Sequence, residues 1–188
     1  DDSLSAQKAI AEISSEFDKL HRQWHPWQQG ELGQLNKILT RKKKTAASTS
    51  IIKLIKDSQR LSGLSNGLFN PAIGQLIKLW QFDQLENKQY QFKLPDAEQI
   101  NTLLKQQPKM TDIIITGSDL KSNNSAVSLD FGAFAKGVAI EKMIAILKKY
   151  NINNAIINAC GDLKVIGTKH DRAWRIGIKN PLHTQDSS

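Results

Sequence analysis

The spacing of apolar residues changes near residue 112, and this change limits the fold more than any other feature of the sequence. Upstream of it, apolar residues recur three and four positions apart, which is the spacing of amphipathic helices. Downstream of it, short apolar runs separated by polar turns indicate strands, with one strong helix among them. Helices first and strands later predict an α+β fold, in which helices pack on one face of a mostly antiparallel sheet.

The residues at the expected element ends support this division. Ser48 and Asp96 can each cap the helix that follows, and Asn70 precedes Pro71, which suits the first position of a helix. The expected helices cover residues 3–24, 48–61, 71–80, 97–107 and 134–150. The expected strands are DIIIT, SLDF, NAIINA, LKVIG and WRIGIK, the first two joined by a polar turn around KSNNSA.

The stretch LDFGAFAKG, residues 129–137, contains the pattern most suited to binding a ligand. Asp130 stands where an expected strand gives way to a helix, and the small residues Gly132 and Ala133 would let a ligand approach the backbone. The first turn of a helix leaves N–H groups unpaired, which favours phosphate, and Lys136 adds positive charge there. The pattern indicates a diphosphate site, with Asp130 as hydrogen-bond acceptor for a base, sugar or ring nitrogen. A tight glycine turn followed by a solvent-facing lysine would give the same pattern.

The charge balance gives a second indication. A net charge of +8 favours an anionic partner such as a nucleotide, a nucleic acid or an acidic membrane face, although a basic surface can also serve solubility alone. RKKK at residues 41–44 suits a solvated turn or a nucleic-acid patch. No recognised nucleic-acid motif accompanies it, so we expect no nucleic-acid partner. Cys160 is the single cysteine, expected as a small buried side chain, so no disulfide can form within the chain.

Several stretches of the sequence are similar to motifs of the FAD:protein FMN transferase family, ApbE. LDFGAFAKGVAIEK resembles the family's DLGxIAKGxAxD signature, and SNGLFNPAIGQLIKLWQF resembles its SxGxFDPxxGPLvxLWGF block. GELGQLN, NAIINACGDLKVIG and WRIGIKNP are similar to further family blocks. All of these stretches follow one another in the family's order, from the first expected helix to Pro181.

The resemblance implies an ApbE-like fold and an enzyme. Members transfer FMN from their substrate FAD to a Thr or Ser hydroxyl of an acceptor flavoprotein, release AMP, and use Mg²⁺ to break the diphosphate. A metal suits this chemistry because it neutralises charge as the P–O bond breaks. Trp27 lies near a family aromatic that packs on the flavin nucleotide. By motif matching, Ala133 falls at a position whose backbone carbonyl coordinates Mg²⁺. The residues that fall at FAD-contacting positions are Leu68, Phe69, Asn70, Asp130 and Lys136.

The sequence also departs from the family pattern. Asn70 stands where many members have Asp, and Cys160 replaces the first glycine of a GGD turn. The family's SGxYER and HIxDPxTG segments are not found, so we expect residues 1–188 to form one ApbE-like domain that lacks the C-terminal metal-binding segment. This leaves open an alternative function, that of a non-catalytic FAD-binding or carrier protein.

The resemblance further implies a periplasmic or cell-envelope location, because members are mostly lipoproteins or exported proteins of bacteria. Membrane attachment would then run through a removed N-terminal lipoprotein segment. The first residues, DDSLSAQKAI, lack the basic and apolar regions of a signal peptide, and are typical of the start of a mature or trimmed chain.

Overall fold

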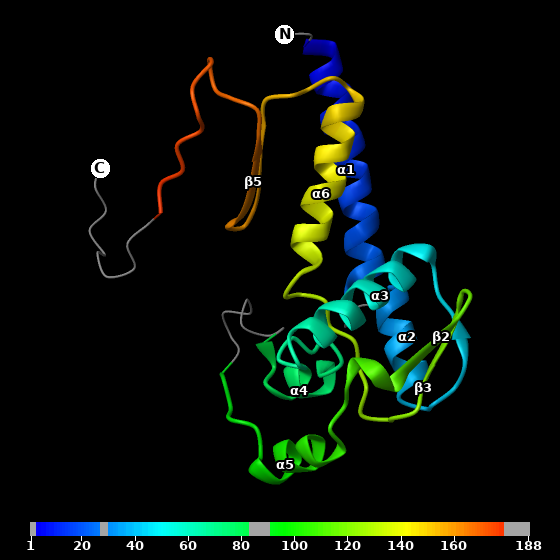
Figure 1. Cartoon of the computed structure of the whole chain (residues 1–188). Coiled ribbons are helices and arrows are strands. Elements are labelled where there is room, and N and C mark those ends of the chain that lie inside the picture. The colour runs from blue at the N-terminus through cyan, green and yellow to red at the C-terminus, as the bar shows by residue number, and fades with distance from the viewer. Residues whose placement is uncertain (1–2, 27–29, 83–90, 179–188) are drawn as a thin grey trace. The chain divides into compact units, whose positions relative to one another are not determined.

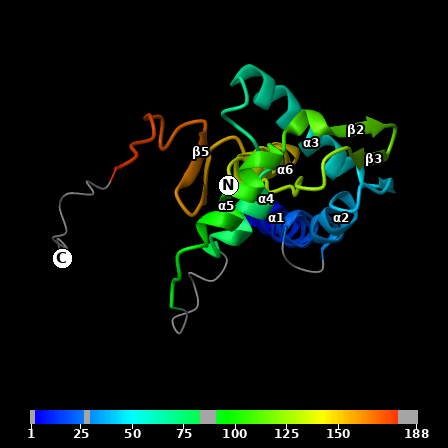
Figure 2. The same ribbon diagram turned by 90° about the horizontal axis from the view of Figure 1, so that it is seen from below.

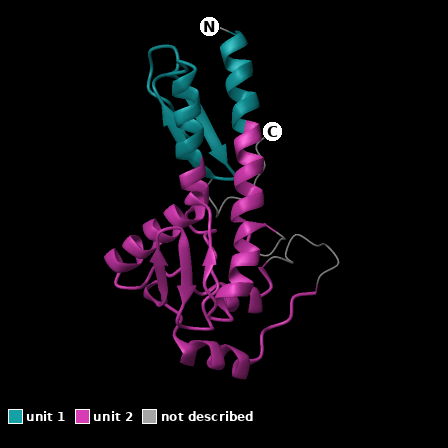
Figure 3. Cartoon of the chain, turned by 90° about the vertical axis from the view of Figure 1, so that its right-hand side faces the viewer, with its two compact units in different colours: residues 1–13, 140–188 teal, residues 14–139 magenta. Residues whose placement is uncertain are grey.

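The structure is a computed structural model that describes residues 3–26, 30–82 and 91–178 of the chain. The chain divides into two compact units (Figure 3). The main unit comprises residues 14–139, and the hairpin unit comprises residues 1–13 and 140–188. Helices α1 (Ser3–Trp24) and α6 (Ala135–Lys149) contribute residues to both units.

The main unit combines helices with a small antiparallel sheet (Figure 1). Besides its share of α1 and α6, its elements are α2 (Glu31–Leu39), β1 (Thr45–Ala46), α3 (Thr49–Leu64), α4 (Gly74–Leu79), α5 (Ala97–Gln106), the 3-10 helix η2 (Met110–Asp112), β2 (Ile113–Thr116) and β3 (Asp119–Ser122). Strand β3 lies in the middle of the sheet and pairs antiparallel with both β1 and β2. The β2–β3 hairpin lies beside α2 (Figures 1 and 2).

The core of the main unit is built by one face each of α2 and α3, together with β3 and residues 126–131. Apolar residues three and four apart on the two helices give each of them a single buried stripe. Burial of each such side chain contributes about 1.5–3 kcal/mol. Residues on both sides of Asp130 belong to this core, so its backbone is held firmly. The fully buried core side chains include Leu32, Leu39, Ile51, Leu54, Ile55, Leu120, Val127, Leu129 and Phe131.

The hairpin unit is organised by the antiparallel pair β4 (Ala155–Ala159) and β5 (Asp162–Ile166). Alternate residues of β4 pack against a buried cluster formed by Ala9 of α1 and by Ile140, Ile144 and Leu147 of α6. A polar contact joins the same two helices, because Lys149 and Tyr150 both donate hydrogen bonds to the Glu12 carboxylate.

Much of the predicted secondary structure is confirmed. The first helix covers the predicted residues 3–24, and NAIINA and LKVIG form the β4–β5 pair. Ser48 caps α3 by accepting a hydrogen bond from the Ile51 N–H at 3.3 Å, and Asp96 caps α5 by accepting one from the Glu98 N–H at 2.8 Å. The predicted α+β class is correct, and the antiparallel strands of the described residues form two separate sheets.

The predicted start of the helix after Asn70 is wrong. Helix α4 begins at Gly74, with Ile73 as its N-cap, so Pro71 does not occupy the first helical position. The cause is a long-range pairing, since Ile73 forms a parallel β-bridge with Ser128. The pairing engages the Ala72 carbonyl and the Gly74 N–H with Ser128, so the regular helix begins only at Gly74.

Two predicted strands are also absent from the described residues. In SLDF only Ser128 is paired, in an isolated bridge, and the true partner of β2 is β3, which is closer in the chain. WRIGIK forms no strand over residues 174–178, and its last residue, Lys179, lies outside the described residues. Alternation of apolar residues is not enough to make a strand, because a strand also needs a neighbour to accept its hydrogen bonds.

Candidate functional site

Two of the predicted site segments lie side by side because their backbones are hydrogen-bonded. The Asp130 N–H donates to the Pro71 carbonyl at 2.9 Å, and the Ser128 N–H donates to the Ala72 carbonyl at 3.1 Å. The Gly74 N–H returns a bond of 2.7 Å to the Ser128 carbonyl. A Cβ atom at Gly74 would lie 2.6 Å from that carbonyl oxygen, so this close approach requires glycine. The turn after α3 is thereby fixed next to the start of α6.

A cluster of three phenylalanine rings joins the same two segments. The Phe69 and Phe134 ring centroids lie 5.6 Å apart at an interplanar angle of 87°. Phe134 also meets the buried Phe131, with centroids 5.8 Å apart at 83°. Both pairs have the edge-to-face geometry that aromatic rings favour. Phe69, a predicted FAD-contacting residue, therefore packs against the residue that immediately precedes α6.

Asp130 lies at the boundary of the core and is 9% exposed. Its Oδ1 accepts a hydrogen bond of 2.8 Å from the Gly132 N–H, and the Ala135 N–H donates to the Phe131 carbonyl at 2.8 Å. The expectation that amides at this junction are unpaired is therefore wrong for Gly132 and Ala135. A carboxylate has about four lone-pair sites, so Asp130 keeps acceptor capacity for a ligand.

Ala133 and Lys136 are both exposed at the start of α6. Ala133 makes no hydrogen bond within the described part of the chain, so no partner there occupies its carbonyl oxygen. Lys136 belongs to the first turn of the helix, as predicted. The structure thus brings Asp130, Ala133 and Lys136 together with Phe69, in one region of the main unit.

The other two predicted residues differ in their surroundings. Leu68 is 92% exposed, because Asn66 and Gly67 turn the chain outward through left-handed conformations with φ of 51° and 82°. The Asn70 side chain donates to the Pro108 carbonyl at 2.8 Å and accepts from the Ala72 N–H at 3.2 Å. A carboxylate here could not donate to Pro108, so the departure from the family's Asp adds a structural contact.

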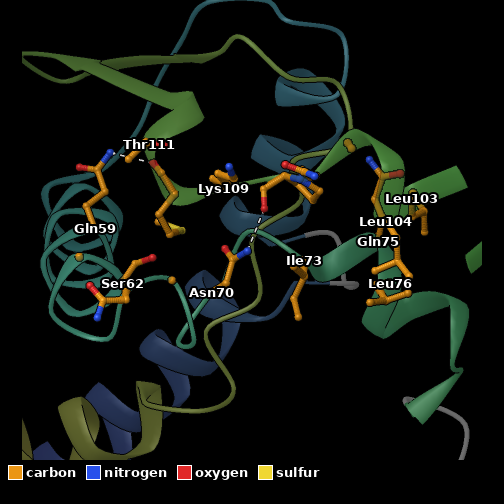
Figure 4. A pocket seen from close by; sticks show the side chains of 17 residues that line it. Gln59, Ser62, Asn70, Ile73, Gln75, Leu76, Leu103, Leu104, Lys109 and Thr111 are labelled. Atoms are coloured by element: carbon orange, nitrogen blue, oxygen red, sulfur yellow. Dashed lines mark hydrogen bonds between the residues drawn. The ribbon is translucent and has the colours of Figure 1, made fainter. Parts of the chain in front are cut away.

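A cavity of about 580 Å³ opens between α3 on one side and α4 with α5 on the other. Figure 4 shows Gln59 and Ser62 on the α3 side, Leu76 and Leu103 opposite, and Asn70 between them. Its lining includes Asn70 but not the remaining predicted site residues. A second hollow of about 1060 Å³ is lined in part by Ser128 and Asn36.

Sequence reasoning missed Asn36, which supports the site from α2. Its side chain is 7% exposed and forms hydrogen bonds to both backbone polar groups of Leu129. The signal that could have revealed it is an amide on the otherwise apolar, core-facing stripe of the helix that contains GELGQLN. A buried amide needs partners, and the strand-to-helix junction supplies them.

Three further expectations have different outcomes. Cys160 is exposed, not buried, because it forms with Gly161 a turn in which both residues have positive φ, 54° and 100°. Such a turn directs its side chains away from the hairpin. Trp27 lies outside the described residues. Among the helices that the structure describes, none has the length and apolar character needed to cross a membrane.

The fold and the site define an α+β protein in which two features hold residues 129–134 at the start of α6. One is the set of backbone hydrogen bonds between residues 71–74 and 128–130, here called the backbone ladder, and the other is the phenylalanine cluster. A sequence profile described as the ApbE family matches residues 3–188. The chain belongs to the ApbE family, so the resemblance seen in its sequence motifs is confirmed.

Curated relatives and solved structures agree with this assignment. The chain is 36% identical over 181 residues to the FAD:protein FMN transferase of Rhodobacter capsulatus, covering 94% of this chain and 33% of that protein. It is 26% identical to the Vibrio cholerae protein of that name, over 76% of this chain and 42% of the other. The solved flavin transferase ApbE from Vibrio cholerae superposes with a TM-score of 0.80 at 24% identity, covering 96% of this chain and 57% of that chain.

A second solved structure, the ApbE protein of Thermotoga maritima, gives a TM-score of 0.82 at 22% identity, covering 95% of this chain and 57% of the other. At these identities the structural likeness establishes the fold. The chain spans between a third and three fifths of the length of the relatives named here.

Proposed function

We propose that this chain acts in FAD:protein FMN transfer, moving FMN from FAD to a Thr or Ser hydroxyl of an acceptor flavoprotein with release of AMP. Membership of the ApbE family and the names of its relatives support the reaction. The observation that carries the proposal for this chain is the backbone ladder between residues 71–74 and 128–130. It gathers the residues that motif matching assigns to FAD into one region.

In the proposed reaction, the acceptor hydroxyl oxygen attacks the phosphorus of the FMN half of FAD. A new P–O bond forms, the P–O bond to the AMP phosphate breaks, and AMP leaves with that electron pair. The hydroxyl proton passes to solvent or to a neighbouring base. Phosphoryl transfer of this kind depends mainly on positioning and on stabilisation of negative charge.

Each residue has a role in this proposal. Lys136 faces the diphosphate and stabilises its charge, because an ammonium group pairs strongly with phosphate oxygens. Asp130 accepts a hydrogen bond from the nucleotide with the oxygen that is not bound to Gly132. Phe69, supported by Phe134, offers an apolar contact to the ligand, and the exposed Leu68 extends that contact. Asn70 holds the turn that carries them.

The proposal includes Mg²⁺, with the Ala133 carbonyl as one ligand. Mg²⁺ takes about six oxygen ligands, several of which are commonly waters and substrate phosphate oxygens. Within residues 3–26, 30–82 and 91–178 there is no group of three or more His, Cys, Asp or Glu side chains that could hold a metal ion. These residues do not form a metal site by themselves, so we assign no step of the reaction to the metal.

Mass spectrometry of an acceptor tests the proposed function. The chain is incubated with FAD, Mg²⁺ and a flavoprotein subunit that carries a target Thr or Ser, and the acceptor should gain the mass of one FMN as AMP appears. Lys136→Gln should slow both signals together. FAD binding without mass gain or AMP would contradict transfer and support the alternative, a non-catalytic FAD-binding or carrier protein.

We also propose a periplasmic or cell-envelope location, which rests on the resemblance to exported and lipid-anchored members. Fractionation of cells that express the gene from its natural start codon tests it. The protein is expected in the periplasmic fraction, or in the membrane fraction if a lipid anchor precedes residue 1. Recovery with cytoplasmic proteins alone would contradict the proposal.

A further inference from the structure

A basic cavity lies in the hairpin unit, in a part of the chain to which the proposed flavin chemistry assigns no role. It has a volume of about 430 Å³, which lies within the range of small-molecule sites. It is lined by Ile156, Lys169, His170, Arg172, Ala173, Trp174 and Arg175. The lining includes three permanent cations, one imidazole and one indole, but no acidic residue.

The turn after β5 forces two of these cations together. Lys169 and Arg172 are antiparallel bridge partners that exchange backbone hydrogen bonds of 2.8 and 3.0 Å. The two residues between them, His170 and Asp171, both adopt left-handed conformations, with φ of 48° and 60°. Side chains of directly opposed residues project on the same face, and like charges in such a pair are destabilising.

No ion pair within the described residues compensates for this charge. The side chains of Lys169, Arg172 and Arg175 form no ion pair or hydrogen bond there, and the nearby Asp171 carboxylate is neither paired with them nor part of the cavity lining. An oxyanion seated between Lys169 and Arg172 would remove the repulsion. Arginine is especially suited to this, because its planar guanidinium can bind two phosphate oxygens at once.

The cavity also has a wall for a flat ring. The Trp174 indole is partly buried and fixed, because its Nε1 donates to the Ile166 carbonyl at 3.1 Å. Ile156 of β4 is 42% exposed and adds an apolar surface. A fixed indole beside guanidinium groups that form no ion pair within the described residues favours a ligand with an aromatic ring and an anionic group.

We propose that this cavity binds a small phosphate ester that carries an aromatic ring. Lys169, Arg172 and Arg175 hold the phosphate, and Trp174 with Ile156 contacts the ring. The assignment uses residues of the hairpin unit alone, whereas the flavin proposal uses residues of the main unit. The two proposals therefore stand or fall separately.

Nuclear magnetic resonance of the ¹⁵N-labelled chain tests the site with phenyl phosphate as probe. The amide shift changes caused by phenyl phosphate should saturate and be concentrated at residues 169–175. The Kd of phenyl phosphate should be at least about fivefold below that of inorganic phosphate, because the ring adds contact. Phenol, which lacks the phosphate, should give no saturable shift. Equal affinity for phenyl phosphate and inorganic phosphate would overturn the ring contact, and shifts spread over the surface would overturn the site.

A charge-matched pair of variants completes the test. Lys169→Gln combined with Arg172→Gln should raise the Kd for phenyl phosphate by about tenfold or more. Lys105→Gln combined with Lys121→Gln removes the same net charge from exposed positions in the main unit and should change the Kd less than about twofold. Equal weakening in both double variants would show general attraction to a basic protein and would overturn the proposal.

Discussion

Asn36 forms hydrogen bonds to both backbone polar groups of Leu129, the residue immediately before Asp130. Its Nδ2 donates to the Leu129 carbonyl at 2.9 Å, and its Oδ1 accepts from the Leu129 N–H at 2.7 Å. Both bonds are buried, so water cannot replace them. Through this pair of hydrogen bonds, helix α2 fixes the position of Leu129, where the chain leaves the core shortly before α6 begins.

Asn36→Ala should destabilise the protein because it leaves two buried backbone groups of Leu129 without partners. Each unsatisfied buried group costs about 1–3 kcal/mol, so the free energy of unfolding should fall by about 2–6 kcal/mol. Urea denaturation measures this loss. Asn123→Ala, at an exposed position close to the same segment, should change the stability by less than about 0.5 kcal/mol. A similar small change for Asn36→Ala would refute the importance of this pair.

Phe134→Leu should lower both the free energy of unfolding and the affinity for FAD. The substitution keeps an apolar side chain but removes two edge-to-face contacts, each worth about 0.5–1.5 kcal/mol. Phe69 would lose the ring that positions it. Thermal denaturation and FAD titration measure the two effects, with Phe17→Leu at an exposed site of α1 as control. Unchanged FAD affinity in Phe134→Leu would exclude Phe69 as an oriented contact.

Glu12 should make the stability of the hairpin unit depend on acid pH. The Lys149 ammonium, which donates at 2.7 Å, and then the Tyr150 hydroxyl hold the pKa of Glu12 below its ordinary value of 4.5. A lowered carboxyl pKa contributes stability above the unfolded pKa and loses it as pH falls through the folded pKa. Wild type should therefore exceed Glu12→Gln in Tm at neutral pH, and this difference should vanish in acid below pH 4.5.

A Tm series at several pH values measures this effect, with Asp18→Asn as a control at an exposed carboxylate of α1. The pKa of Lys149 is raised chiefly by its hydrogen bond to Glu12, and so is that of Tyr150. The stability that the protonated forms of these two groups contribute should therefore be present at neutral pH and lost only as pH rises above 10.0. A Tm difference between wild type and Glu12→Gln that is constant from acid to neutral pH would contradict this account.

The sequence predicted local features well and long-range ones poorly. Ser48 and Asp96 cap their helices as expected, because a cap depends on residues within one turn. Asn70 and SLDF were interpreted incorrectly because the pairing of Ile73 with Ser128 joins segments 55 residues apart in the chain. The role of Asn36 depends on a residue 93 positions away, which no local pattern can reveal.

In the candidate site, too, the sequence predicted the local features and missed the long-range contacts. The family motifs identified Asp130, Ala133 and Lys136 at the start of α6, where the structure has them exposed or at the edge of the core. The motifs did not reveal that Gly132 is bound by Asp130, or that Phe134 packs on Phe69. The bond between Asp130 and Gly132 is local, whereas the contact between Phe134 and Phe69 follows from the fold, because it depends on the backbone pairing of residues 71–74 with 128–130.

Lys136→Gln should weaken FAD binding without affecting the fold. Lys136 is an exposed residue in the first turn of α6, and loss of an ammonium–phosphate contact costs about 1.5–3 kcal/mol, which is about tenfold or more in Kd. The affinity of wild type should also fall with salt more steeply than that of the variant. Lys148→Gln, in the last turn of the same helix, is the matched control. Equal Kd values for the two variants would remove Lys136 from the site.

Titration of FAD against wild type and Asp130 variants tests the central claim most directly, with quenching of flavin fluorescence as the signal. Asp130→Asn can keep the hydrogen bond to the Gly132 N–H, so it preserves the turn while removing the charge. Saturable binding to wild type is predicted, with a Kd raised by about tenfold in Asp130→Asn and further in Asp130→Ala. FAD binding in both folded variants that equals wild type would contradict the assignment of this junction as the flavin site.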